Sequence, residues 1–398
     1  MSTMLWTLPL LMMACRDGST DVKTSHETDP APTTDTSADT STDTAIDERF
    51  QPLVDQLLLD LAENDAPGVS VAVIDADGTW LGAGGSADLA QGIDARTCHR
   101  WHVASTTKML AASATLRLVE QGRLELDDPA RRWLPADVVE DVANADEATV
   151  RQLLDHTAGV PDYLTLGFFL DAFNGSLEPR SAAESLEGIR GMDADFPPGS
   201  DLAYSNANYL LLSLVLSELT GQPAYDVVHE QVTEPLGLHD TLGRSEDPRA
   251  LVRGYMDLRG DGTLIDFTDS TTAVMAGEGK LDGGLVSTPR DLAVLVRALA
   301  HGELLDPSST EAMQDVRPYG PDDLEGIEDA YGLGLARVQT PYGPAIGHYG
   351  TVHPYQTLAF HLVDHDLTLV VATNGYVGEV GDWLNSEAPF HLLFRETP

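Results

Sequence analysis

Lysine is almost absent from this chain of 398 residues, which has it only at positions 23, 108 and 280 and otherwise takes its positive charge from arginine. Basic residues as a whole are scarce: there are 23 of them against 64 acidic residues, which leaves a formal net charge of -41 at pH 7. Such a surface repels phosphate, so the charge excludes a protein that binds nucleic acid. The acidity is typical of a solvated surface and does not identify a ligand.

Cysteine is also rare, with Cys15 and Cys98 the only two. The apolar run of residues 5–14 is too short to span a bilayer and ends in a small residue before Cys15. It resembles a bacterial lipoprotein signal, and the resemblance implies a signal peptide over residues 1–14 and a lipid on Cys15. We therefore expect an exported bacterial lipoprotein on the periplasmic face of a membrane or on the cell surface. Its only membrane contact would be the lipid anchor at Cys15, and Cys98 would be unpaired.

Apolar side chains are nearly missing from residues 33–44, where Thr, Asp and Ser dominate. A segment of this composition cannot bury enough surface to fold alone, so we expect residues 15–49 to form a flexible acidic tether. The sequence as a whole is 42% hydrophobic, which is enough for a large core. We expect residues 50–398 to form the folded domain.

The spacing of apolar residues predicts both helices and strands in this domain. Leucines at 53, 57, 58 and 61 recur at helical spacing. The apolar run 69–74, a turn at 75–78 and a second strand predict an antiparallel hairpin. A long helix is expected from Ser105 to the stop at Gly122. Further strands are expected at three places late in the chain: 331–335, 355–362 and 367–373.

Strands early and late in the chain, with a mostly helical pattern between them, predict an α+β fold. The strands must join in one mainly antiparallel sheet flanked by helices, and the middle of the chain would form an inserted all-helical lobe. The expected sheet subdomain covers about 50–104 and 280–398, and the expected helical subdomain covers about 105–279. A cleft between the two subdomains, with Ser105 in it, is the expected active site.

Ser105 and Lys108 are the residues whose pairing most clearly indicates chemistry. Residues three apart share one face of a helix, so the Ser105 hydroxyl and the Lys108 amine can approach each other near a helix N-terminus. Arginine stays protonated, whereas a buried lysine can lose its proton and act as a base. The pair therefore indicates a serine nucleophile with an adjacent base.

Short motifs follow this pair along the chain in a definite order. They are Trp101–Lys108, Gly122–Pro129, Leu153–Gly159, Tyr204–Asn206, Glu234–Leu238, Gly283–Thr288 and Gly347–Thr351. The ordered set resembles the serine beta-lactamase-related family, which includes class C beta-lactamases, DD-peptidases and family VIII esterases. Within that family the pattern is most similar to D-alanyl-D-alanine carboxypeptidases with a His-x-Gly third motif. The resemblance implies a beta-lactamase/transpeptidase-like fold and a catalytic domain over 50–398.

The resemblance also implies the roles of four catalytic residues. Ser105 would attack a carbonyl and form an acyl-enzyme. Lys108 and Tyr204 would share one proton network, and the general base in each step is left open between them. His348 stands where many relatives have Lys and some DD-peptidases have His, and its role would be electrostatic.

Substrate binding is implied for three further residues. Asn206 would orient the acyl side chain of the substrate. Gly350 would let the backbone approach the substrate, and the N–H groups of Thr351 and Ser105 would form the oxyanion hole.

Two positions bear on the substrate. Tyr349 replaces the family's usual Thr, whose hydroxyl helps to hold a substrate carboxylate. Arg337 could supply that charge partner as a bidentate clamp, or it could be a solvated surface arginine. The segments 98–102 and 361–365 contain histidines but lack a standard zinc spacing, so we expect neither a metal nor a cofactor.

Three functions remain open at this point. The first is a serine hydrolase of the D-alanyl-D-alanine carboxypeptidase type, and the second is an esterase, or less readily a beta-lactamase, on the same scaffold. The third is a non-catalytic protein that binds cell-wall peptides. Retention of all three reactive groups, Ser105, Lys108 and Tyr204, argues against the third. The expected partner is a small-molecule or peptide substrate, and the protein is expected to be a monomer.

Overall fold

The computed structural model describes residues 50–63, 67–165, 167–168, 179–243, 251–275, 277, 279–319, 329–375 and 393–394. These residues belong to one compact unit, Ile46–Pro398. The expected signal peptide, acidic tether and lipid anchor at Cys15 lie outside the described residues. No helix within the described ranges combines the length and the apolar character needed to cross a bilayer.

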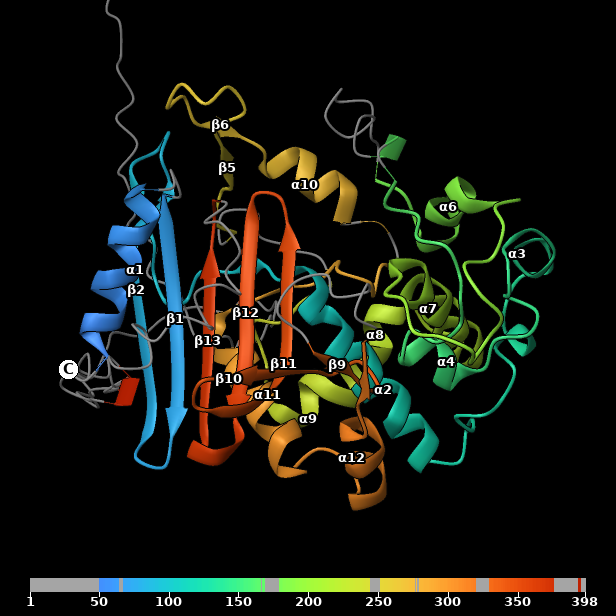
Figure 1. The fold of residues 1–398 in the computed structure, drawn as a ribbon. Coiled ribbons are helices and arrows are strands. Elements are labelled where there is room, and N and C mark those ends of the chain that lie inside the picture. The colour runs from blue at the N-terminus through green and yellow to red at the C-terminus, as the bar shows by residue number, and fades with distance from the viewer. Residues whose placement is uncertain are drawn as a thin grey trace, which may run out of the picture. The chain divides into compact units, whose positions relative to one another are not determined.

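A nine-stranded antiparallel sheet forms the centre of this unit, in the order β3-β2-β1-β13-β12-β11-β10-β9-β8 (Figure 1). Its strands are β1 Gly68–Asp75, β2 Gly78–Asp88, β3 Ile93–Asp94, β8 Arg317–Pro318, β9 Ala330–Tyr331, β10 Ala336–Thr340, β11 Gly343–Val352, β12 Tyr355–Leu362 and β13 Leu367–Thr373. Two small ribbons pair β4 Trp101–His102 with β7 Val286–Ser287 and β5 Tyr255–Met256 with β6 Ile265–Asp266. Pairing of β1 with β13 joins the two ends of the domain in one sheet, as the sequence predicted.

Helices cover both faces of the sheet. They are α1 Gln51–Glu63, α2 Thr107–Glu120, α3 Ala136–Asp141, α4 Val150–Leu154, α6 Ala182–Leu186, α7 Asn206–Thr220, α8 Ala224–Val228, α9 Glu234–Leu236, α10 Thr268–Met275, α11 Pro289–His301 and α12 Pro307–Gln314. Helix α1 packs on β1 and β2, whereas α11 packs on β1, β12 and β13. Helices α3, α4, α6 and α7 gather on the right in Figure 1, beyond β11.

Alternation along the strands divides the sheet side chains between two cores. In β12, Phe360 belongs to the core under α1, which includes Leu53 and Trp80. Its neighbour Ala359 belongs to the core shared with the helices. We call these the α1-side core and the helix-side core. Successive residues of a strand face opposite sides, so this alternation fixes which β11 side chains face the helices.

Local sequence explains several element ends. Asp75 Oδ1 accepts hydrogen bonds from the backbone N–H groups of Asp77 and Gly78, which forms the turn between β1 and β2. Helix α11 starts with the Thr288 side chain accepting from Asp291 N and ends at Gly302, which has φ +66°.

The α+β fold with one mainly antiparallel sheet is confirmed, and the strands at 355–362 and 367–373 have the predicted bounds. Other boundaries were wrong. The helix expected from Ser105 begins at Thr107, the expected strand 331–335 is reduced to Ala330–Tyr331, and β10 and β11 were not predicted as strands. Strand β11 is rich in glycine, which has low strand propensity, and it is held by pairing with β10 and β12.

Candidate active site

Ser105 lies in a tight turn between β4 and α2. The turn is a single 3₁₀ turn, Ala104–Thr106, and Ala104 has φ +47°, which is costly for a residue with a side chain. Hydrogen bonds to Val103 O from Thr106 N and Thr106 Oγ1, 3.2 and 2.8 Å long, hold the turn in this conformation. The backbone strain therefore lies immediately before the candidate nucleophile.

Gly350 brings β11 against this turn. A side chain at position 350 would have its Cβ 2.5 Å from Val103 O and 2.9 Å from Ser105 N. Contacts that short do not occur with real Cβ atoms, so only glycine allows the strand to lie this close. The expected close approach at Gly350 is thus an approach to the nucleophile turn, and it brings β11 next to the Ser105 N–H.

Lys108 is fully buried on the first turn of α2. Its Nζ lies 3.1 Å from Ser105 Oγ, 2.8 Å from Asn206 Oδ1 and 2.6 Å from Asp282 O. A neutral amine has two N–H bonds, and Asn206 and Asp282 can accept both. The remaining lone pair is then available for the Ser105 proton, which is the arrangement that a general base requires.

Asn206 links this amine to a carboxylate. It is the first residue of α7, and its Nδ2 and backbone N donate to Asp162 Oδ2 at 2.8 and 3.2 Å. Both ends of the Asn206 amide are therefore engaged, one by Asp162 and one by Lys108. The side chain orients Lys108, in addition to the substrate-binding role that the resemblance implies.

The Asp282 carbonyl is positioned by glycines and by a buried tyrosine. A Cβ at Gly283 would lie 2.4 Å from Met275 Cε, and one at Gly284 would lie 2.4 Å from the Tyr225 hydroxyl oxygen. The Asp282 carboxylate accepts a 2.6 Å hydrogen bond from Tyr163 OH. The motif Gly283–Thr288 thus serves to place a backbone acceptor beside Lys108.

Tyr204 lies between Lys108 and a group of buried aromatic rings. Lys108 Nζ is 4.8 Å from the Tyr204 ring centroid, and the His156 ring centroid is 4.3 Å from it. His156 is fully buried in the left-handed region, with φ +58°. Burial and, secondarily, the charge of Lys108 lower the pKa of His156 well below its usual value. A neutral imidazole therefore supports the Tyr204 ring.

His348 is buried on β11, on the helix side of the sheet, opposite Ala359. Its Nδ1 is hydrogen-bonded to Tyr349 O, which can only accept, so Nδ1 carries the proton and Nε2 accepts from Tyr331 OH at 2.9 Å. Burial, followed by the positive charge of Lys108, lowers the pKa of His348 to about 3. The expected electrostatic role is therefore limited to the dipole of a neutral ring.

Thr351 and Tyr349 have different surroundings on β11. Thr351 is exposed and pairs with Gln356. Tyr349 pairs with Leu358 and packs against the α1-side core, on the face of the sheet opposite His348. Tyr349 stands where the family usually has a Thr that helps to hold a substrate carboxylate, and in this structure its ring lies on the α1 side of the sheet.

Arg337 does not act as a free clamp in this structure. Its Nε and Nη2 donate to the two carboxylate oxygens of Asp329 at 3.2 and 3.0 Å. This bidentate pair uses the geometry that a substrate carboxylate would need. Without substrate, the partner of Arg337 is therefore Asp329, in a partly exposed ion pair, and the carboxylate clamp stays a prediction.

The expectation for Cys98 was wrong. This residue is disulfide-bonded, whereas the sequence analysis expected an unpaired thiol. Cys15, the only other cysteine of the chain, lies outside the described residues. Spacing along the sequence carries no information on such pairing, which depends on the distance between the two residues in the fold.

The sequence did not indicate several residues of the site, namely His156, Asp162, Tyr163, Asp282 and Tyr331. His156 lies within the motif Leu153–Gly159, and Asp282 directly precedes the motif Gly283–Thr288. Their positions in the ordered set of motifs could therefore have indicated a role in the site. The sequence contains no signal for Tyr163 and Tyr331, because their roles arise from contacts between distant parts of the chain. The described residues near Lys108 include no group of His, Cys, Asp and Glu side chains arranged to hold a metal.

The fold and the Ser105–Lys108 pair define a serine hydrolase with the beta-lactamase/transpeptidase-like fold. A family model described as Beta-lactamase matches residues 46–386. The chain belongs to this family of serine hydrolases, so it is an enzyme and not the non-catalytic binding protein considered above.

Individual relatives and structures agree with this family. Penicillin-binding protein 4* of Bacillus subtilis is 26% identical over 78% of this chain and 69% of its own length. The chain spans about half the length of further curated relatives that it matches. The structure is similar to a D-stereospecific amidohydrolase from Streptomyces sp., with a TM-score of 0.70, 27% identity and coverage of 87% of this chain and 99% of that one. A D-amino acid amidase from Ochrobactrum anthropi has a TM-score of 0.73 at 25% identity, with coverage of 88% and 97%.

Proposed function

We propose that this enzyme hydrolyses amide or peptide bonds formed by the carbonyl group of a D-amino acid, as DD-peptidases do, through an acyl-enzyme on Ser105. The observation that carries the proposal is the position of Lys108 Nζ, 3.1 Å from Ser105 Oγ, with its other two hydrogen bonds made to Asn206 and Asp282. The names of the similar amidohydrolase and amidase support the D configuration.

The proposed reaction has two steps. The deprotonated form of Lys108 takes the Ser105 hydroxyl proton while Oγ bonds to the substrate carbonyl carbon, and the carbon–nitrogen bond then breaks. The leaving amine takes up a proton from the network of Lys108 and Tyr204. Water then hydrolyses the ester on Ser105 and regenerates the hydroxyl. The N–H groups of Ser105 and Thr351 would stabilise the oxyanion, each by about 2.7 to 4 kcal/mol.

The states of three candidate binding groups support substrates that need no C-terminal carboxylate. His348 is neutral above a pKa of about 3. Arg337 is paired with Asp329, and Asp162 places a carboxylate beside Asn206. These observations favour amides, or peptides extended beyond the scissile bond, over the free dipeptide terminus that a carboxypeptidase recognises.

An esterase is the second candidate. It is favoured because neutral His348 and paired Arg337 do not offer a free positive charge to a substrate carboxylate. A beta-lactamase is less well supported, because the described residues include no evident group that would accelerate deacylation of a penicilloyl-enzyme. One panel separates these functions: D- and L-phenylalanine amide, a peptide ending in D-Ala-D-Ala, a p-nitrophenyl ester and a chromogenic cephalosporin.

We expect D-phenylalanine amide to be cleaved with a higher kcat/KM than its L enantiomer and than the D-Ala-D-Ala peptide. Ser105→Ala should lose cleavage of every substrate and should lose the adduct that a fluorophosphonate leaves on the wild type in intact-mass spectrometry. A wild type that cleaves only the ester would replace amide hydrolysis by the esterase. An adduct on another residue would disprove the role of Ser105.

We also propose that the protein is exported and acts as a monomer. The disulfide at Cys98 supports an oxidising compartment. An intramolecular disulfide would occupy the Cys15 thiol that a lipid anchor needs, so the two fates of Cys15 exclude each other in one molecule. Mass spectrometry of the non-reduced protein from its native host decides between a Cys15–Cys98 linked peptide and a lipidated Cys15.

A further inference from the structure

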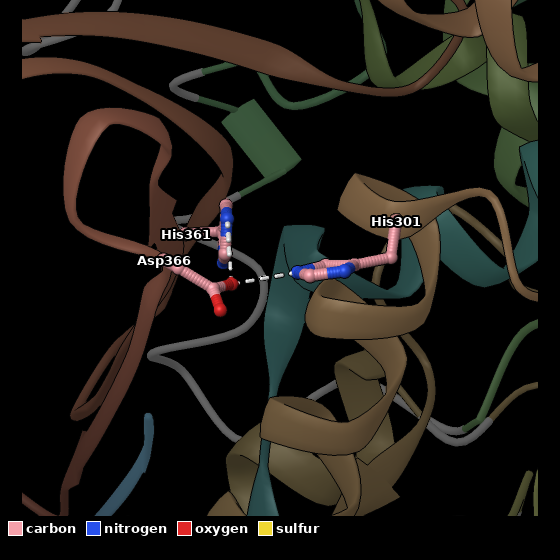
Figure 2. Close-up of side chains that lie close together, drawn as sticks. All are labelled: His301, His361 and Asp366. Carbon is pink, nitrogen blue, oxygen red and sulfur yellow. Dashed lines mark hydrogen bonds and ion pairs between the residues drawn. The ribbon is translucent and has the colours of Figure 1, made fainter. Parts of the chain in front are cut away.

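Three side chains that could bind a metal meet at the end of the sheet, away from Lys108. His301 is the last residue of α11, His361 lies near the end of β12, and Asp366 is in the turn before β13. One ligand atom of each lies within 4.8 Å of the others. Figure 2 shows the Asp366 carboxylate joined by dashed lines to both imidazole rings.

His361 has the features of a preorganised ligand. It is buried, and its Nδ1 lies 3.0 Å from the hydroxyl of Thr368, which is also buried. When Nδ1–H donates to that hydroxyl, Nε2 carries the lone pair and is directed toward Asp366. Nε2 lies 3.9 Å from Asp366 Oδ1, which is too long for a hydrogen bond. Ligand histidines in metal sites are commonly oriented in this way by a bond at the other ring nitrogen.

The distances suit a first-row transition metal. His301 Nε2 lies 2.8 Å from Asp366 Oδ1, so the observed separations run from 2.8 to 4.8 Å. Ligand atoms bound to tetrahedral Zn²⁺ at about 2.0 to 2.2 Å lie roughly 3.4 Å apart. The side chains of His301 and Asp366 are 34% and 46% exposed. They can therefore adjust, and they leave a fourth position open to water.

Arg297 is the group that competes with a cation here. It lies one turn before His301 on α11, and its guanidinium is 3.0 Å from each Asp366 oxygen. A metal on Oδ1 would replace one of these two contacts, and the contact with Oδ2 would remain as support for the carboxylate. The site therefore has to bind its ion beside one positive charge, and its two imidazole nitrogens are ligands that suit Zn²⁺.

We propose that His301, His361 and Asp366 form a Zn²⁺ site with water as the fourth ligand. The bound ion joins the end of α11 to the hairpin of β12 and β13, so the site stabilises the packing of helix on sheet. This replaces the expectation that the chain binds no metal. The histidine spacing did not suggest it, because the second imidazole comes from a helix 60 residues away in the sequence.

The test is titration of the purified, metal-free full chain with ZnCl₂. Calorimetry measures binding, and thermal unfolding measures the change in Tm. We expect one saturable site and a rise in Tm with Zn²⁺. His301→Ala removes an exposed ligand at a helix end and should lose both effects while keeping its metal-free Tm. His361→Gln should lose them as well. His365→Ala is the matched control, because it removes an exposed imidazole next to Asp366 that is not part of the group, and it should bind like the wild type.

Co²⁺ provides a second measurement. It should give the intense visible absorption of a tetrahedral site in the wild type and in His365→Ala, and Zn²⁺ should abolish that absorption. The proposal is overturned if the wild type shows no saturable binding, or if His301→Ala binds Zn²⁺ as tightly as the wild type does.

Discussion

Two buried lysines, Lys108 and Lys280, show what separates a reactive group from a structural one in this enzyme. Both are 0% exposed. Lys108 contacts the Ser105 hydroxyl, whereas Lys280 donates to the hydroxyls of Tyr163 and Ser185 at 3.0 and 3.1 Å. Burial lowers the pKa of Lys280. Burial alone therefore does not make a catalytic lysine, because only Lys108 has the nucleophile as a partner.

Asp282 connects the two lysines. Its backbone carbonyl accepts from Lys108, and its carboxylate accepts from Tyr163, which in turn accepts from Lys280. Burial and the neighbouring Asp282 charge raise the pKa of Tyr163 well above its usual value, so this hydroxyl stays protonated. The Lys280 region is thus a scaffold that holds one acceptor of the Lys108 region in place.

The largest effect is expected from Lys108→Arg. Guanidinium remains protonated and cannot take the Ser105 proton, so kcat/KM should fall by several orders of magnitude although the charge is preserved. Steady-state kinetics with the best substrate of the panel measure this loss. Retention of more than about a tenth of kcat/KM, a change below about 1.4 kcal/mol in activation free energy, would make Lys108 only a positive charge.

Lys280→Met should act on stability and leave the chemistry in place. The change removes the hydrogen bonds that Lys280 donates to Tyr163 and Ser185, so the free energy of unfolding should fall by about 1.5 to 3 kcal/mol. Urea unfolding measures the loss. At a temperature where the variant is folded, kcat/KM should stay within about tenfold of the wild type. Unchanged stability with lost activity would place Lys280 in the reaction and remove the contrast with Lys108.

The buried His102 provides a structural group whose neutral state can be tested by the pH dependence of stability. Burial lowers the pKa of His102 to about 4. Below the unfolded-state value of about 6.5 the unfolded chain takes up a proton that the folded chain refuses, so stability is lost as the pH falls from 6.5 toward 4. By this linkage, lowering the pH from 8 to 5 should cost the wild type about 2 kcal/mol more than it costs His102→Gln. Denaturant titrations at the two pH values measure the difference, and equal losses would contradict a neutral His102.

The smallest effect is expected from Arg337→Ala. Its partner is Asp329 at a partly exposed position, so the free energy of unfolding should change by about 1 kcal/mol or less. The ratio of kcat/KM for the D-Ala-D-Ala peptide to that for D-phenylalanine amide should not change. A selective loss of the peptide reaction would restore Arg337 as the carboxylate clamp.

The sequence predicted the parts of the fold that depend on local pattern. Strands β12 and β13 had the expected bounds because they are buried over their whole length and consist mostly of apolar, aromatic and β-branched residues. Strand β11 was missed because glycine has low strand propensity, whereas Gly350 is required by the close approach of the strand to Ser105. The pairing of Arg337 with Asp329 and the position of Tyr349 on the other face of the sheet were not predicted, because each depends on tertiary contacts.

The sequence by itself determined the pairing of Ser105 with Lys108, because three residues of helical chain bring the two side chains together wherever the helix lies. Tertiary structure alone decided what else meets Lys108: Asn206 and Asp282, which are 98 and 174 residues away. Tertiary structure also buries His348, which keeps its imidazole neutral, and pairs Arg337 with Asp329. Burial and long-range contacts set protonation and availability, and neither can be read from the spacing of residues along the chain.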